Sequence, residues 1–184
     1  RDLISSLGLS QKKITIEGFD VSHHGGENGV ASSVRFSILG PEKSNYKLFN
    51  IPKKLSGNDL GSIKHLLERR INKASINPLP DIILIDGGKL QLEAALTTFS
   101  ALVKKPPMIL SIVKGSKRVR STETILSRDG VIEMQKDRPG FLLLQEIRDE
   151  SHRFAIKSNR NKKNKLNQYS VLEKVNGIGP NRKK

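Results

Sequence analysis

Two aspartates stand at the ends of apolar, strand-like runs, each with a glycine pair close behind. Asp20 follows ITIEGF, and Asp86 follows PDIILI, a continuous apolar run typical of a buried parallel strand. If the two strands are parallel neighbours, both carboxylates lie at the edge of the sheet where open α/β sheets bind ligands. Two ionised carboxylates this close repel each other, and a bound divalent cation offsets the repulsion and keeps both ionised. Because oxygen ligands select hard ions, we expect Asp20 and Asp86 to hold Mg²⁺ or Mn²⁺.

Each candidate residue also has a plainer interpretation. An aspartate at a strand end often caps a helix or forms a turn. Lys89, directly after two glycines, suggests a phosphate loop, but the pattern Gly-x-x-x-x-Gly-Lys-Ser/Thr is absent. His152, in RDESHRF on the last predicted helix, reaches the metal or acts as a general acid-base group only if that helix packs beside the same sheet edge.

The period of the apolar residues predicts the elements that must position these side chains. We expect strands at 14–20, 30–39, 46–51, 80–86 and 108–113, helices at 56–71 and 87–102, a hairpin within 122–134, and a long helix from Pro139 that becomes a basic linker after about Lys157. The first three strands form an antiparallel meander, and strand–helix–strand units follow. The expected fold is therefore α/β, a mixed sheet flanked by helices.

Positive charge is the strongest bulk signal. Lys and Arg number 33 against 18 acidic residues, a net charge of +15, which favours nucleic acid as a partner and an anionic membrane surface second. Only 4% of residues are aromatic, which argues against a platform that stacks single-stranded bases and favours contact with backbone phosphates. The residues expected to contact DNA are Lys89, Lys114, Lys117, Arg118, Arg120, Arg153, Lys162 and Lys163.

Other bulk features narrow the class of protein. No apolar run approaches the roughly 20 residues that span a bilayer, and no signal-peptide pattern is present. The lack of cysteine excludes disulfides and thiolate metal sites, which fits a cytoplasmic protein. Because the chain begins at Arg1, we expect it to be a piece of a longer chain.

Four motifs, FDVSHHGG, LIDGGKLQLEAA, LLLQEIRDESHRFAI and VNGIGPNRKK, together resemble the C-terminal endonuclease half of the UvrC family, which makes incisions in bacterial nucleotide excision repair. The resemblance runs from about Ile14 to the end of the chain. It implies an RNase H-like fold and a cut in double-stranded DNA 5′ to a lesion. It also implies a UvrB–DNA pre-incision complex as partner, with UvrA acting upstream, and a catalytic set of Asp20, Asp86 and His152.

The same resemblance bears on the rest of the chain. A further family carboxylate lies in a GDD-like stretch, which reads GND here, so Asp59 is the candidate for that role. The loop SHHGG after Asp20 also departs from the family pattern, and the closing GIGP resembles the first hairpin of a helix-hairpin-helix module. We expect a leader at 1–13, an endonuclease domain at 14–160, a basic linker at 161–169, and the start of a truncated helix-hairpin-helix DNA-binding module at 170–184.

Two other functions stay open at this point. A different RNase H-like nuclease, such as a resolvase or an RNA-hybrid hydrolase, would prefer four-way junctions or hybrids. A non-catalytic DNA-binding module would use Asp20 and Asp86 only as caps, and its metal binding would not change in an Asp20→Asn, Asp86→Asn double variant.

Overall fold

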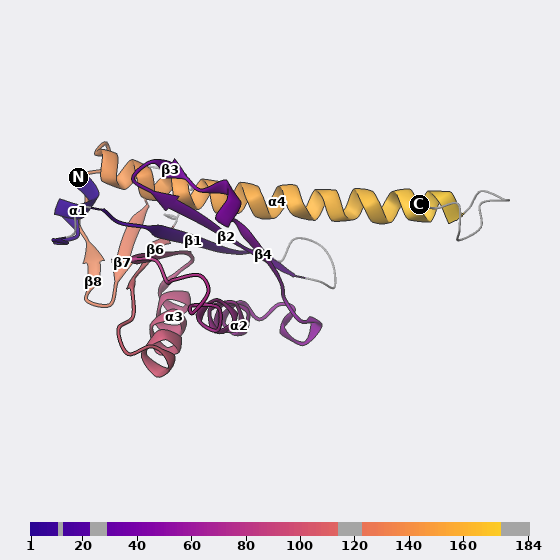
Figure 1. Ribbon diagram of the computed structural model, residues 1–184, viewed down its shortest axis with the longest axis horizontal. Helices are drawn as coiled ribbons and strands as arrows, with labels where there is room; N and C mark the ends of the chain where they lie inside the picture. The colour runs from indigo at the N-terminus through magenta and orange to yellow at the C-terminus, as the bar shows by residue number, and fades with distance from the viewer. Residues whose placement is uncertain (11–12, 23–28, 114–122, 174–184) are drawn as a thin grey trace.

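Strands and helices follow one another along most of the chain (Figure 1). The structure, a computed structural model, describes residues 1–10, 13–22, 29–113 and 123–173, with only the backbone described for 22 and 159–173. The elements are α1 (Asp2–Ser6), β1 (Ile16–Ser22), β2 (Val30–Ser37), β3 (Gly40–Pro41), η1 (Lys43–Asn45), β4 (Lys47–Asn50), η2 (Lys53–Leu55), α2 (Asp59–Ile71), β5 (Ile82–Asp86), α3 (Lys89–Leu102), β6 (Met108–Val113), β7 (Thr124–Ser127), β8 (Gly130–Ile132) and α4 (Pro139–Glu173).

The eight described strands form one mixed sheet. Their order is β3-β2-β1-β5-β6-β7-β8, and β4 also pairs with β2. The pairs β1–β5 and β5–β6 are parallel, and the other pairs are antiparallel. The antiparallel meander, the strand–helix–strand units and the flanked mixed sheet that the sequence predicts are therefore confirmed.

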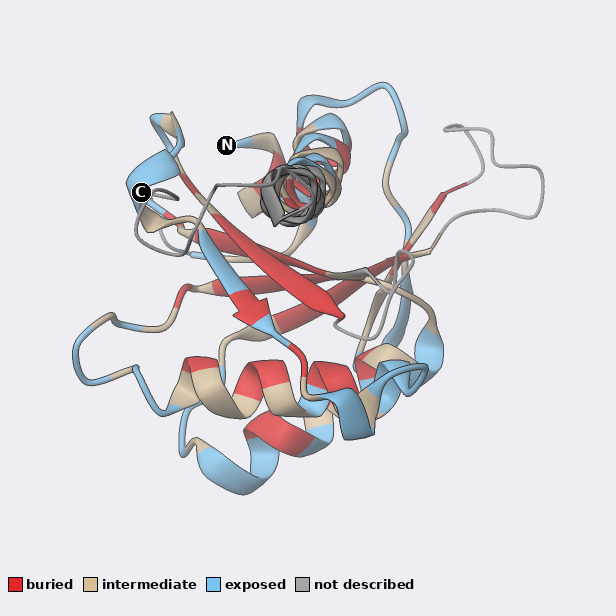
Figure 2. Cartoon of the chain, turned by 90° about the vertical axis from the view of Figure 1, so that its right-hand side faces the viewer, coloured by how far each residue is buried: buried red, intermediate tan, exposed pale blue. Residues whose placement is uncertain are grey.

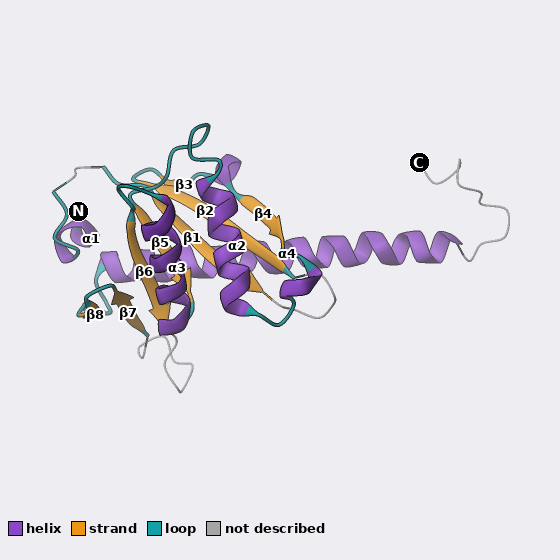
Figure 3. Cartoon of the chain, turned by 90° about the horizontal axis from the view of Figure 1, so that it is seen from below, coloured by secondary structure: helices purple, strands orange, loops and turns teal. Residues whose placement is uncertain are grey.

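Helices cover both faces of the sheet, with α4 on one face and α2 and α3 on the other (Figures 2 and 3). The central strand β5 shows how the sequence produces these layers. Its residues Ile82 and Leu84 belong to the core beneath α4, and Ile83 and Ile85 belong to the core beneath α2 and α3. Because side chains alternate along a strand, a parallel strand covered on both faces needs a continuous apolar run.

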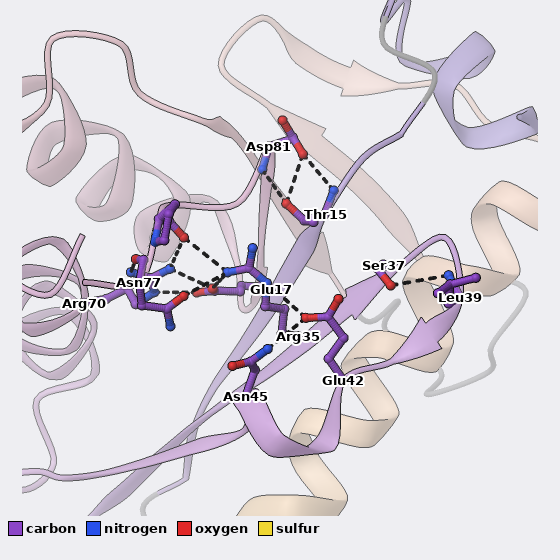
Figure 4. Close-up of polar contacts among 11 residues, drawn as sticks. Thr15, Glu17, Arg35, Ser37, Leu39, Glu42, Asn45, Arg70, Asn77 and Asp81 are labelled. Atoms are coloured by element: carbon purple, nitrogen blue, oxygen red, sulfur yellow. Dashed lines mark hydrogen bonds and ion pairs between the residues drawn. The ribbon is translucent and has the colours of Figure 1, made fainter. Parts of the chain in front are cut away.

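A buried ion pair fastens α2 to β1 (Figure 4). Arg70 donates to the Glu17 carboxylate from Nε at 2.7 Å and from Nη2 at 2.8 Å, and Arg35 Nη1 donates to it at 3.0 Å. Arg70 also donates to the backbone carbonyls of Asn77 and Pro78. Glu17 is 2% exposed and Arg70 is 3% exposed, so each charge depends on the other to offset its desolvation.

The first residues of the chain pack against the folded core, in the stretch 1–13 expected to form a leader. Leu3 of α1 is 3% exposed and joins the apolar cluster beneath α4. The Asp2 carboxylate accepts a hydrogen bond from the backbone N–H of Gly140, in the first turn of α4, at 2.8 Å. The two-residue strand β3 pairs with β2 and lies between the strands expected at 30–39 and 46–51.

Helix α4 is longer than the sequence predicts. It runs from Pro139 to Glu173 without a break, so the residues expected to form a linker at 161–169 are helical. The backbone continues well past the sheet (Figure 1). Residues 174–184, which include most of the predicted helix-hairpin-helix segment, lie outside the described residues. No helix in the described parts of the chain is both long enough and apolar enough to cross a membrane.

Candidate active site

The register of the sheet brings Asp20 and Asp86 side by side. In the parallel ladder between β1 and β5, Phe19 lies opposite Ile85, so the two aspartates are the next residues on neighbouring strands. Strand β1 extends to Ser22, so Asp20 lies within the strand instead of at its tip. Its carboxylate is consequently almost covered, at 8% exposure.

His152 joins the two aspartates from α4. Its Nδ1 lies 3.2 Å from Oδ2 of Asp20, across 132 residues of sequence. One ligand atom from each of Asp20, Asp86 and His152 lies within 4.8 Å of the other two. No second group of three such ligands occurs among the described residues. The last helix thus packs beside the sheet edge that carries the aspartates, which is the arrangement that His152 needs in order to reach them.

Gly18 allows α4 to come this close. It precedes Asp20 by two residues on β1 and therefore faces α4 with it. A Cβ at Gly18 would lie 2.5 Å from Cγ2 of Ile147 and 3.3 Å from the Ile147 carbonyl oxygen. Ile147 is fully buried and lies on α4 five residues before His152. The missing side chain at Gly18 thus sets how near the histidine approaches the sheet.

A buried polar cluster fixes α4 on the side of β7. Arg148 forms an ion pair with Glu123, and Gln145 Nε2 donates to the same carboxylate at 2.7 Å. Arg148 Nε also donates to Asp149 Oδ1 at 3.0 Å. Burial opposes the charge of Arg148, but its hydrogen bonds to Asp149 and Glu123 outweigh that effect and raise its pKa. The charged cluster holds the turn that precedes His152.

The three converging side chains form a donor set that suits a divalent metal ion. Two carboxylates and one imidazole converge, and each of these groups is a common ligand of divalent metal ions. The two neighbouring acidic groups repel each other unless a cation lies between them. The His152 side chain is 39% exposed, whereas the Asp20 side chain is 8% exposed, so the histidine is the more solvent-accessible of the two.

Asp59, the fourth residue predicted to be catalytic, is not part of this group of ligands. It lies exposed in the first turn of α2. The neighbouring Asn58 caps α2, since its Oδ1 accepts a hydrogen bond from the Gly61 N–H at 2.8 Å. Asparagine and aspartate cap helices equally well, so the change to GND keeps the cap. A catalytic role of Asp59 stays a prediction.

The predicted DNA-contacting residues are placed only in part. Lys89 begins α3 with 80% of its side chain exposed, 3.9 Å from Glu93. Arg153 directly follows His152, is 67% exposed and pairs with Glu150. Lys114, Lys117, Arg118 and Arg120 lie outside the described residues, as do His23 and His24 of the loop after Asp20. Lys162 and Lys163 lie on the backbone of α4, and their side chains are not described.

Sequence reasoning missed the residues that position the site. No pattern in the neighbouring sequence marks Gly18 or Glu123 as important for the site, because their role depends on how α4 packs. Ser32 is marked by such a pattern. Along β2 every second residue faces α4, and Ser32 is a polar residue in the row with Val30, Val34 and Phe36. A buried serine in such a row needs a hydrogen-bond partner, which is a reason to examine it.

Comparisons with known proteins identify the family. The model of the UvrC RNase H endonuclease domain matches residues 5–156. The UvrABC system protein C of Pseudoalteromonas translucida (strain TAC 125) is 41% identical over 91% of this chain and 28% of its own length. That of Pseudomonas savastanoi pv. phaseolicola is 39% identical over 99% of this chain and 31% of its own length. The chain thus spans about 30% of the length of these curated relatives.

Among solved structures, human ENDOV is similar with a TM-score of 0.49 and 11% sequence identity, over 79% of this chain and 86% of that chain. The resemblance stated from the motifs, with the RNase H-like fold that it implied, is confirmed by the family model. The chain belongs to the family of UvrC RNase H endonuclease domains.

Proposed function

We propose that the chain is the metal-dependent nuclease that cuts double-stranded DNA 5′ to a lesion in bacterial nucleotide excision repair. One observation carries the proposal: Asp20, Asp86 and His152 converge at one edge of the sheet, with ligand atoms within 4.8 Å. The family supports the reaction, since its model describes an endonuclease domain. The proposed place of action is the cytoplasm.

In this proposal Asp20 and Asp86 hold Mg²⁺ or Mn²⁺. When bound, the ion supplies Lewis-acid chemistry, because it neutralises charge that develops on the scissile phosphate and activates water. The buried Asp20 orients the His152 ring through the contact at Nδ1. His152 then either completes the ligand set or carries a proton at a ring nitrogen.

The charge of the chain supports DNA as the substrate. A net charge of +15 favours a polyanion, and contacts with phosphates position DNA without reading its sequence, which suits an enzyme that cuts wherever damage occurs. We place Lys89 and Arg153 near the scissile strand, because Lys89 lies three residues after Asp86 and Arg153 directly follows His152. Lys114, Lys117, Arg118, Arg120, Lys162 and Lys163 are the further proposed contacts. The proposed macromolecular partner is the UvrB–DNA complex, with UvrA acting upstream.

The test is nicking of a labelled duplex that carries a bulky lesion and a pre-made nick on its 3′ side. With Mn²⁺ or Mg²⁺ we expect a cut 5′ to the lesion, which EDTA and Asp20→Asn abolish. Asp129→Asn, the same chemical change at an exposed turn, is the matched control and should cut normally. Binding to the duplex should weaken steeply with added salt.

If the chain alone binds DNA without cutting, the assay is repeated with UvrA and UvrB present. The proposal is wrong if no metal-dependent cut occurs even then, or if Asp20→Asn cuts as well as the unmodified chain.

A further inference from the structure

Ser32 lies directly beside the most buried residue of the site. In the antiparallel ladder between β1 and β2, Ser32 is the partner of Asp20. It is fully buried, at 0% exposure, and faces α4 like the aspartate. A buried hydroxyl in this position must find an acceptor, and the one it uses connects the sheet to the helix.

The Ser32 hydroxyl donates a hydrogen bond to the backbone carbonyl of Ser151 at 2.8 Å, across 119 residues of sequence. Ser151 is the residue before His152, and it is also fully buried. The Ser151 hydroxyl donates within the helix, to the carbonyl of Arg148 at 2.8 Å. The contact from Ser32 therefore ties the backbone at His152 to the strand that pairs with Asp20.

This contact is directional, whereas most of the neighbouring packing is not. Around it α4 meets the sheet through apolar side chains, including Leu144 and Ile147. Burial of apolar side chains favours close packing of α4 on the sheet. It does not fix the position of the helix along the sheet, because its free energy depends on the buried area and not on direction. The Arg148–Glu123 pair limits sliding on the side of β7, and Ser32 limits it on the side of β2.

We propose that Ser32 is a positioning residue that sets the distance between His152 and Asp20. This inference rests on the function proposed above. Ser32 touches neither DNA nor the metal in this role. It acts through the Ser151 carbonyl, and its loss lets the turn that carries His152 shift relative to both aspartates.

The test compares three variants of the 184-residue chain. Ser32→Ala removes the hydroxyl, and Ser32→Thr keeps it. Ser33→Ala is the matched control, since Ser33 is the next residue of β2, is 2% exposed and faces the opposite side of the sheet. Circular dichroism and the melting temperature first establish that each variant is folded.

The first readout is Mn²⁺ affinity measured by calorimetry, without DNA. Loss of a residue that orients a metal ligand typically reduces affinity or activity about 10-fold to 100-fold, so we expect Ser32→Ala to bind Mn²⁺ about 10-fold more weakly. In the nicking assay kcat should fall by about the same factor, while KM for DNA changes less than about twofold. Ser32→Thr should restore most of both, and Ser33→Ala should match the unmodified chain.

Equal Mn²⁺ affinity and kcat in Ser32→Ala and the unmodified chain would overturn the inference. So would equal losses in Ser32→Ala and Ser33→Ala, which would indicate general loosening of the strand. If Ser32→Ala does not fold, Ser32→Cys, with a weaker donor of similar shape, takes its place under the same criteria. A failure of the proposed function is distinguished by the unmodified chain, which would then neither bind Mn²⁺ nor cut DNA. In that case the proposed role of Ser32 is also wrong.

Discussion

Replacement of Gly18 by alanine is expected to force α4 away from β1 and so to disturb the active site. The new Cβ would lie 2.5 Å from Cγ2 of Ile147, whereas carbon atoms in contact prefer about 3.5–4.0 Å. The gap must therefore widen by about 1 Å, and Ile147 has little room to turn because it is fully buried.

The magnitude follows from this overlap. An extra methyl group in a packed core costs about 1–3 kcal/mol of the free energy of unfolding, or roughly 2–12 °C in melting temperature for a chain of this size. His152 lies on the same rigid helix, five residues after Ile147, so a shift of the helix also moves the imidazole. A misplacement of about 1 Å at a reacting group lowers the rate by up to about 100-fold.

Thermal unfolding and the nicking assay measure the two effects, and a second substitution identifies their cause. Ile147→Ala removes Cγ2. In the Gly18→Ala background it should therefore lower the free energy of unfolding by about 1–3 kcal/mol less than it does in the unmodified chain. Ile147→Val keeps Cγ2 and is the control that should give no such relief. A Gly18→Ala variant with normal melting and normal kcat, or equal relief by valine and alanine, would refute the reasoning.

Three further predictions concern the metal, the buried ion pair and a tyrosine. Mn²⁺ at about 100 times its dissociation constant should stabilise the chain by about 2.7 kcal/mol, and Asp86→Asn should abolish this gain in a thermal-shift assay. Glu17→Gln should lower the free energy of unfolding in urea by about 3 kcal/mol, because Arg70 stays charged at 3% exposure. Burial and the nearby Glu150 carboxylate raise the pKa of Tyr46 above its ordinary value. The unfolded chain therefore loses this proton first, stability falls as pH rises above about 10, and Tyr46→Phe should lose less stability between pH 9 and pH 11.

Each of these predictions has a result that contradicts it. An Asp86→Asn variant with an unchanged Mn²⁺ shift would place the ion elsewhere. For the ion pair, Glu42→Gln is the control, since Glu42 meets Arg35 at 3.3 Å with 32% of its side chain exposed, and it should cost less than about 1 kcal/mol. Equal costs at Glu17 and Glu42 would contradict the argument from burial. Identical alkaline curves for Tyr46→Phe and the unmodified chain would exclude Tyr46 as the titrating group.

The pairing of Asp20 with Asp86 is predictable from sequence, because it depends on local patterns. A continuous apolar run predicts a buried parallel strand, and a parallel neighbour puts both carboxylates at one edge. The contact of His152 with Asp20 does not follow in this way. It depends on the position of α4 along the sheet and on the distance between helix and sheet. Gly18 and the Ser32–Ser151 contact determine these two quantities, and both act between residues more than a hundred positions apart in the sequence.

A buried ion pair and the end of the last helix are two features that the sequence analysis did not predict. The ion pair of Glu17 with Arg70 does not follow from local sequence, because it depends on how α2 packs against β1. The stretch 161–169 is rich in Asn and Lys, which suggested a linker, but it contains neither Gly nor Pro. Lysine favours helices and asparagine only weakly opposes them, so nothing there ends α4.

The continuity of α4 has a mechanical consequence. About 20 residues separate His152 from Glu173, which at 1.5 Å per residue is a rod of about 30 Å. A tilt of about 5° around the anchored turn would move the far end of that rod by about 3 Å. A protein or DNA strand that binds the helix near residue 173 and tilts it would therefore also change the position of His152, by a smaller distance than at the far end.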